Sequence, residues 1–215
     1  MTAVDLGKIG VWTSYRPFGV ERAGEAAKLV EHLGFGAWWI GASPRVPDVR
    51  PVLEATSKLV AATGILNVWA NEPAETAAAT SERAAGTHTY FVPVEHTRAA
   101  RKRLGPDKLV APELACVVDT DPVRAKAVAR DYAEHYLGLR NYVQNLLRHG
   151  FTDDDVADGG SDRLIDALVP QGSAAEIAEI VHAHLDAGAD HVCLQPLGED
   201  GIPRDAWAAL ANALI

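Results

Sequence analysis

The stretch that decides the fold is Pro73-Ala-Glu-Thr-Ala-Ala-Ala-Thr-Ser-Glu-Arg-Ala-Ala85, which continues without a break into Gly86-Thr-His-Thr-Tyr-Phe-Val92. The first part is rich in residues that favour a helix, and the second contains the aromatic and β-branched residues typical of a strand. Three strand–helix units are predicted before this junction and three after it. A closed parallel (β/α) barrel has about eight such units. The sequence therefore predicts two ends of one barrel with too little chain between them.

The pattern of apolar runs separated by helical segments predicts an α/β fold, derived from a TIM barrel, with about six parallel strand–helix units. Strands four and five of the usual eight are the ones expected to be missing. Before the junction we expect strands at 8–14, 35–41 and 64–70, helices at 20–33 and 51–62, and a helix from Asn71. After it we expect strands at 87–92, 109–118 and 189–196, and helices at 95–104, 173–185 and 203–214.

The stretch from about 123 to 168 is too long for one crossover helix, so we expect a helical excursion of two or three helices. Asp121 and Pro122 suit the N-cap and first position of its opening helix. Ser173 and Glu176 have the spacing of a capping box. No linker or repeat interrupts the sequence, which predicts a single domain over 1–215.

Composition restricts the possible partners. The chain of 215 residues has 29 acidic and 20 basic residues, a net charge of −9, which argues against nucleic acid or an anionic membrane as partner. No apolar run approaches the roughly 18 residues of a membrane helix, and no signal peptide pattern begins the sequence. Cys116 and Cys193 lie in apolar strands, so we expect buried, reduced thiols and a cytoplasmic location.

Three segments carry a family resemblance: Thr63-Gly-Ile-Leu-Asn-Val-Trp-Ala-Asn-Glu-Pro73, Ala85-Gly-Thr-His-Thr-Tyr-Phe-Val-Pro-Val-Glu-His-Thr97 and Leu185-Asp-Ala-Gly-Ala-Asp-His-Val-Cys-Leu-Gln195. In this order they resemble the luciferase-like monooxygenase superfamily, on its deazaflavin (coenzyme F420)-dependent oxidoreductase branch. The resemblance implies a cofactor, coenzyme F420 or alternatively FMN, at the carboxyl ends of the barrel strands. It also implies hydride transfer between the reduced cofactor and an unknown small organic substrate.

The carboxyl ends of the strands are where a barrel enzyme places its chemistry. The residues expected to bind the cofactor there are Trp12, Thr13, Val68, Trp69, Ala70, Asn71, His88, Tyr90 and Gln195. By resemblance, Val68–Asn71 match a bulge with a cis peptide that supports the ring system; the alternative is a plain strand end with Asn71 as a helix cap. For Trp12 and Trp69, a place in the core is an equal alternative. No catalytic residue is assigned.

The eight histidines do not form a metal-binding pattern. His182 and His184 are two positions apart on a predicted helix, so they point in different directions. His88 is expected in a strand beside the junction, where a hydrogen-bonded core histidine is the more common outcome. No metal site is predicted.

The departure from the family concerns the cofactor phosphate, which the family holds in the region missing here. The sequence contains neither G-x-G-x-x-G nor G-x-x-x-x-G-K-[ST]. Two hypotheses follow: an F420- or flavin-dependent oxidoreductase, or a non-catalytic relic that has lost the cofactor and serves as a binding or structural subunit. Removing two strands leaves a smaller closed barrel or two open edges, and a homodimer that covers the gap is expected.

Overall fold

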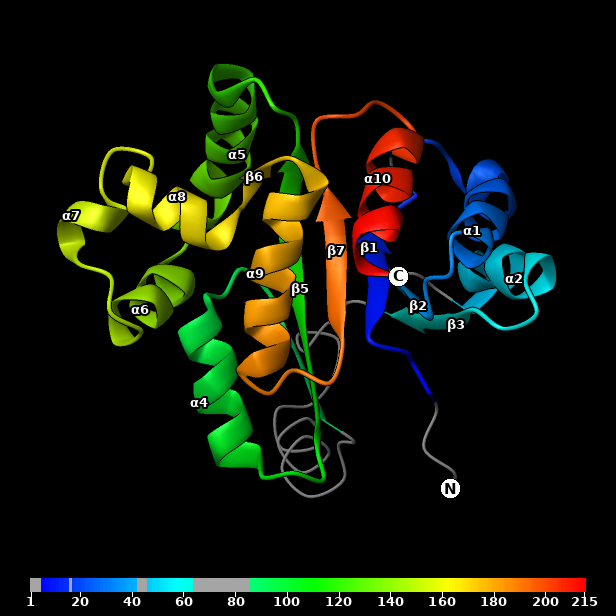
Figure 1. Cartoon of the computed structure of the whole chain (residues 1–215), viewed down its shortest axis with the longest axis horizontal. Coiled ribbons are helices and arrows are strands. Elements are labelled where there is room, and N and C mark those ends of the chain that lie inside the picture. Colours follow the sequence, from blue (N-terminus) through cyan, green and yellow to red (C-terminus); the bar gives the residue numbers. More distant parts are fainter. Residues whose placement is uncertain (1–4, 16, 42–45, 64–85) are drawn as a thin grey trace.

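The computed structural model describes residues 5–15, 17–41, 46–63 and 86–215 (Figure 1). Its strands are β1 (Ile9–Thr13), β2 (Ala37–Ile40), β3 (Val60–Thr63), β4 (Gly86–Thr89), β5 (Leu109–Val118), β6 (Gln171–Gly172) and β7 (Val192–Pro196). All described pairings are parallel, in the order β3-β2-β1-β7-β5-β4, with β6 paired to β5. This confirms the predicted barrel-derived fold.

The two ends of the described sheet lie on either side of residues 64–85. The strands next to that segment, β3 and β4, lie at opposite ends of the strand order. Among the described strands, β3 pairs only with β2, and β4 pairs only with β5. The sheet is therefore not closed by hydrogen bonds between these two strands. The predicted helix at 73–85 lies outside the described residues.

The helices of the first half are a short 3-10 turn η1 (Val20–Arg22), α1 (Ala23–His32) and α2 (Val46–Ala55). Residues 60–62 were predicted as the end of a helix, which is wrong, because they belong to β3. The side chain of Glu31, at the end of α1, accepts hydrogen bonds from the backbone N–H groups of Ser57, Lys58 and Leu59. These bonds hold residues 57–59 in a non-helical conformation that leads into β3. The predicted strand at 64–70 lies outside the described residues.

The second half contains α4 (Val94–Leu104), α5 (Pro122–Leu137), α6 (Arg140–Arg148), α7 (Asp153–Val156), α8 (Asp162–Leu168), α9 (Ala174–Asp186) and α10 (Arg204–Leu214). Asp121 caps α5 by accepting from two backbone N–H groups, with proline at the start of the helix, as predicted. Ser173 and Glu176 form the predicted capping box of α9. The sequence did not predict β6, because two residues are too few for a recognisable strand pattern.

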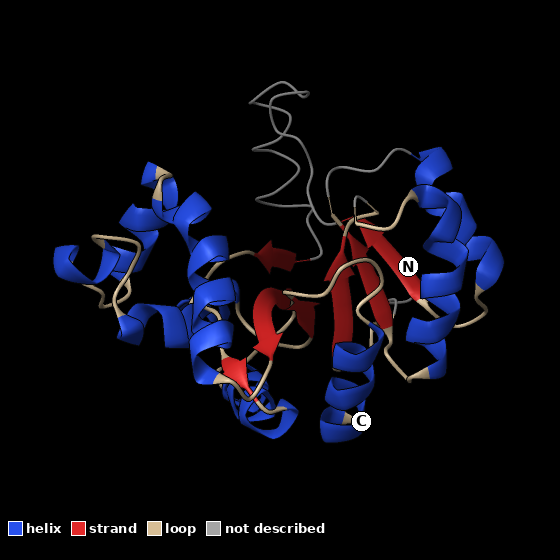
Figure 2. Cartoon of the chain, turned by 90° about the horizontal axis from the view of Figure 1, so that it is seen from above, coloured by secondary structure: helices blue, strands red, loops and turns tan. Residues whose placement is uncertain are grey.

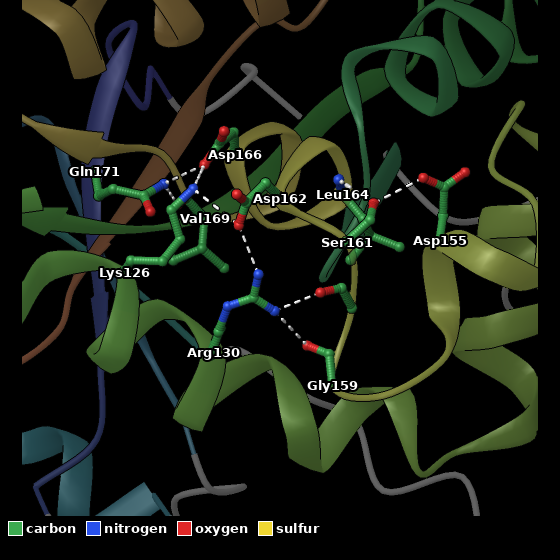
Figure 3. Close-up of polar contacts among 11 residues, drawn as sticks. Lys126, Arg130, Asp155, Gly159, Ser161, Asp162, Leu164, Asp166, Val169 and Gln171 are labelled. Atoms are coloured by element: carbon green, nitrogen blue, oxygen red, sulfur yellow. Dashed lines mark hydrogen bonds and ion pairs between the residues drawn. The ribbon is translucent and has the colours of Figure 1, made fainter. Parts of the chain in front are cut away.

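The helical excursion consists of α5–α8, four helices where two or three were predicted. They gather at one end of the molecule, away from α1 and α2, as the labels of Figure 1 show, and Figure 2 gives the view of the chain from above. Arg130 of α5 holds the turn before α8, because its guanidinium donates to the carbonyl oxygen of Gly160 and, at 2.6 Å, to the carboxylate of Asp162 (Figure 3). Lys126, one helical turn earlier, pairs with Asp166. Polar contacts thus fasten α8 along α5.

The two faces of the sheet differ in what they pack against. Side chains alternate along a strand, so Ile9 and Val11 of β1 face the outer layer that contains Trp38 and Trp207. The opposite face of the same strands carries Trp39, with Ala37, Ala111 and Cys193 around it. The buried side chains of this inner face therefore form a separate and smaller cluster, which we call the inner cluster.

Gly10 is required where β1 passes the inner cluster. A Cβ at this position would lie 2.7 Å from the carbonyl oxygen of Ala37 and 2.5 Å from Nε2 of His191. Because one of these atoms belongs to the backbone of the neighbouring strand, the contact cannot be relieved by a side-chain rotation. Any larger residue must push β1 away from β2.

Candidate functional site

Three of the residues predicted at the strand ends meet on the inner face of the sheet. The ring of Trp12, on β1, contacts the ring of Tyr90, which follows β4, at a centroid distance of 5.2 Å. The hydroxyl of Tyr90 donates to Oε1 of Gln195, on β7, at 2.7 Å. The three residues lie 78 and 105 positions apart in sequence, and only the parallel sheet brings them together. We call Trp12, Tyr90 and Gln195 the mouth cluster.

Two tyrosines of α5, which sequence reasoning missed, complete the polar side of the mouth cluster. The hydroxyl of Tyr132 lies 2.8 Å from that of Tyr90 and 3.3 Å from Oε1 of Gln195. The hydroxyl of Tyr136 donates to that of Tyr90 at 3.3 Å. Tyr132 and Tyr136 are four positions apart, so they share one face of the helix. That spacing was the signal available, but it does not show which strands the face covers.

The hydrogen bonds to Oε1 fix the orientation of the Gln195 amide. With its oxygen held by Tyr90 and Tyr132, its nitrogen is directed away from these two hydroxyl groups. The indole nitrogen of Trp12 is buried and lacks a partner in the described part of the chain. The mouth cluster thus offers two N–H donors beside an aromatic wall, which suits a flat ligand that carries carbonyl oxygens.

Gly41, the residue after β2, makes room for the indole of Trp12. A Cβ at Gly41 would lie 2.5 Å from two carbon atoms of that ring. The rotamer of Trp12 that reaches Tyr90 therefore depends on glycine at this position. The sequence indicated Gly41 only as a strand end, and the structure gives it this steric reason.

His88 lies on the inner face, one position before Thr89 and two before Tyr90. Its ring stacks on Trp39 at 4.4 Å, and its Nδ1 donates to the carbonyl oxygen of Ala111 at 2.8 Å. Burial lowers the pKa of His88 to about 4, so the imidazole is neutral at pH 7. Its contacts are with the inner cluster and not with Trp12 or Gln195.

Thr13 does not join the mouth cluster through its side chain. The residue follows Trp12, so strand alternation turns its side chain to the other face, where its hydroxyl donates to the carbonyl oxygen of Ser14. Its own carbonyl oxygen accepts from Nε1 of Trp38 at 3.2 Å. Val68, Trp69, Ala70 and Asn71 lie outside the described residues.

Glu113 is a further residue that the sequence did not single out. It is 1% exposed, in the middle of β5, and it lies opposite Cys193 of β7. Burial raises its pKa to about 8. The signal in the sequence was a lone acidic residue inside the apolar run Leu109-Val-Ala-Pro-Glu-Leu-Ala-Cys-Val-Val118. A strand pattern alone does not show that such a residue faces the interior.

A groove of about 510 Å³ adjoins Tyr132, and Ala127, Val128, Asp131, Leu197 and Gly198 complete its lining. No lysine or arginine of the described chain lines it. A larger cleft of about 630 Å³ lies between α5, β6 and α9, and no residue of the mouth cluster borders it. Of these two openings, only the groove is lined by a side chain that bonds to the mouth cluster, and that lining contains no cation for a phosphate.

The described residues contain neither a metal-binding cluster nor a membrane-spanning helix. No group of three or more His, Cys, Asp or Glu side chains in the described ranges is placed to hold a metal ion. None of the helices in the described part of the chain has the length and apolar character needed to cross a membrane.

Comparison with known proteins bears on the fold. No family model matches the chain, and no curated protein matches it significantly in sequence. A solved F420-dependent secondary alcohol dehydrogenase, bound to an F420–acetone adduct, is similar with a TM-score of 0.64 and 12% identity, over 96% of this chain and 98% of that one. A coenzyme F420-dependent tetrahydromethanopterin reductase from Methanopyrus kandleri is similar with a TM-score of 0.69 and 12% identity, over 97% and 99%. The chain shares the fold of these enzymes.

Proposed function

We propose that this chain belongs to the luciferase-like superfamily and is an oxidoreductase that uses coenzyme F420, with hydride transfer between the reduced deazaflavin and a small organic substrate. The observation that carries the proposal is the mouth cluster. Trp12, Tyr90 and Gln195 meet at the carboxyl ends of the strands, and the fold is shared with two F420-dependent enzymes. In a barrel of this kind the carboxyl ends carry the chemistry.

The described residues fit the ring system of the cofactor. Trp12 and Tyr90 supply an aromatic wall, and the unpartnered indole N–H of Trp12 and the amide N–H of Gln195 can donate to ring carbonyl oxygens. When bound, the deazaflavin supplies the hydride chemistry. The chain's own part is to orient the ring and to keep water away. Burial raises the pKa of Tyr90, so its hydroxyl stays neutral and keeps its proton for Gln195.

The groove that adjoins Tyr132 does not supply a site for the cofactor phosphate. The groove beside Tyr132 contains Asp131 and no basic side chain of the described chain. This observation favours a second candidate, a non-catalytic binding or structural subunit that keeps the ring-side residues but has lost the phosphate site. FMN, which also carries a phosphate, remains the alternative cofactor and meets the same difficulty.

Titration with F420 and with FMN, followed by cofactor fluorescence, separates these candidates. We expect saturable binding of F420, with affinity weakened about 5- to 30-fold in Tyr90→Phe, because the Gln195 amide loses the hydroxyl that orients it. Gly41→Ala, which displaces the Trp12 ring, should weaken binding as well. Gly138→Ala is the matched control, since a Cβ there comes no closer than 3.5 Å to other atoms. Absence of binding by both cofactors at well above micromolar concentration would refute the enzyme and support the second candidate.

We also propose a homodimer in which a second copy covers the free sides of β3 and β4. Open strand edges present unpaired N–H and C=O groups that favour pairing with another chain. Within the described strands, neither β3 nor β4 has a second partner. Light scattering should therefore give the mass of a dimer at micromolar concentration. A stable monomer under those conditions would contradict this arrangement.

A further inference from the structure

The proposed function assigns no role to the buried carboxyl group of Glu113. Its strand neighbours on the same face are Ala111 and Ala115, so the side chain points to the inner side of the sheet. Its Oε2 atom accepts one long hydrogen bond, 3.5 Å from the backbone nitrogen of Phe91. Its Oε1 atom has no partner among the described residues. Such a site does not provide the partners that an ionised carboxylate needs.

No cation compensates for the burial of this group. In the described part of the chain, no lysine, arginine or histidine pairs with Glu113. An isolated carboxylate in an apolar interior is so unfavourable that the group keeps its proton instead. The physical expectation from geometry is therefore a neutral carboxylic acid, with one O–H that can donate.

The backbone at Phe91 connects Glu113 to the mouth cluster. Phe91 follows Tyr90 directly and has φ of 52°, in the left-handed region that non-glycine residues seldom adopt. It is also 2% exposed, so the turn is fixed within the core. Strained backbone of this kind persists where the surroundings hold it, often at functional sites. The N–H of this turn is the group that faces Glu113.

We propose that Glu113 is a positioning residue that, while protonated, leaves the Tyr90 hydroxyl committed to Gln195 and, when ionised, draws that hydroxyl away and disassembles the mouth cluster. This regulation rests on the proposed function of the cluster. The position of the Tyr90 and Trp12 rings can nevertheless be followed without any cofactor.

The groups around Glu113 determine what ionisation would do. The titratable side chains that interact with it electrostatically are Tyr90, Tyr132 and Tyr142, and the thiols of Cys116 and Cys193. All have their pKa raised, so they are neutral hydrogen-bond donors when Glu113 loses its proton. Bonds to a charged acceptor are stronger than those to an amide oxygen. No described phenol oxygen lies within hydrogen-bond distance of Oε1 while the group is protonated, so the tyrosine side chains are expected to shift from Gln195 toward the new carboxylate.

The test is a pH titration of the cofactor-free protein from about pH 6 to about pH 10, read by infrared and tryptophan fluorescence, because Glu113 is expected to ionise in that interval. In the wild type, the C=O band of a protonated carboxylic acid should disappear with a midpoint near pH 8. Tryptophan emission should change with the same midpoint. Glu113→Gln should abolish both transitions, and Trp12→Phe should abolish only the fluorescence change. Glu134→Gln, an exposed glutamate of α5, should keep both.

Each outcome decides the proposal. A purely structural Glu113 would alter stability, but it would give no fluorescence transition that depends on Trp12. Persistence of that transition in Glu113→Gln would overturn the proposal. If Glu113→Gln does not fold, the wild type and Trp12→Phe decide: absence of a titrating carboxylic acid band in both also overturns it. Failure of F420 to bind would leave these results unchanged, so the two proposals fail separately.

Discussion

Relative to Glu113→Gln, the free energy of unfolding of the wild-type protein is expected to fall by about 2 kcal/mol as the pH rises from about 6.5 to about 8. Burial raises the pKa of Glu113 from 4.5 to about 8 in the folded state. In this interval the folded protein therefore binds one proton more than the unfolded chain. Stability falls with pH wherever the folded state binds more protons. Urea unfolding at a series of pH values measures the effect.

The comparison with Glu113→Gln isolates the contribution of Glu113. Burial lowers the pKa of His88 and His184 to about 4 and also lowers that of His191, so these groups add stability until the histidines of the unfolded chain have lost their protons, which extends above about pH 6.5. Glu113→Gln should keep this histidine contribution and lack the fall due to Glu113, whereas Glu134→Gln should follow the wild type. If the free energy of unfolding changes with pH in the same way in the wild type and in Glu113→Gln, the buried carboxyl group is not protonated.

Gly10→Ala is expected to destabilise the protein by about 3 kcal/mol or more, on the scale of severe overpacking in a core. The new Cβ would lie 2.7 Å from the carbonyl oxygen of Ala37 and 2.5 Å from the ring of His191. Relief requires separation of β1 from β2, which are paired along four residues. The midpoint of urea unfolding should fall accordingly.

The control for this substitution is Gly138→Ala, at the carboxyl end of α5. Gly138 has a helical φ of −73°, and a Cβ there meets only ordinary contacts. Its unfolding midpoint should stay within experimental error of the wild type or rise slightly. If Gly10→Ala unfolds at the same urea concentration as this control, the close packing of β1 against β2 and His191 is wrong.

How far the sequence predicted the site depends on the range of the interactions. Trp12, Tyr90 and Gln195 were predicted because each lies near the carboxyl end of its strand, and parallel strands bring those ends together. Tyr132 and Tyr136 were not predicted, because their contact depends on how the helical excursion folds back over the sheet. No local pattern in the sequence records that path.

The errors in the fold have similar causes. The residues of β3 include two alanines, which favour a helix, but they pair with β2, and Glu31 holds the backbone of the residues just before them. Asp121 and Ser173, in contrast, act within four residues of their own position, and both caps were predicted correctly. Local hydrogen bonds could therefore be predicted from the sequence, whereas contacts between distant segments could be predicted only where the barrel topology required them.

The most direct test of the proposed cofactor site is a crystal structure of the wild-type protein soaked with coenzyme F420. We expect density for the deazaflavin ring against Trp12 and Tyr90, with the amide nitrogen of Gln195 within hydrogen-bond distance of a ring carbonyl oxygen. Density for F420 at another place, such as the cleft between α5, β6 and α9, would contradict the account. Absence of ligand density at the mouth cluster at a saturating concentration of F420 would contradict it as well.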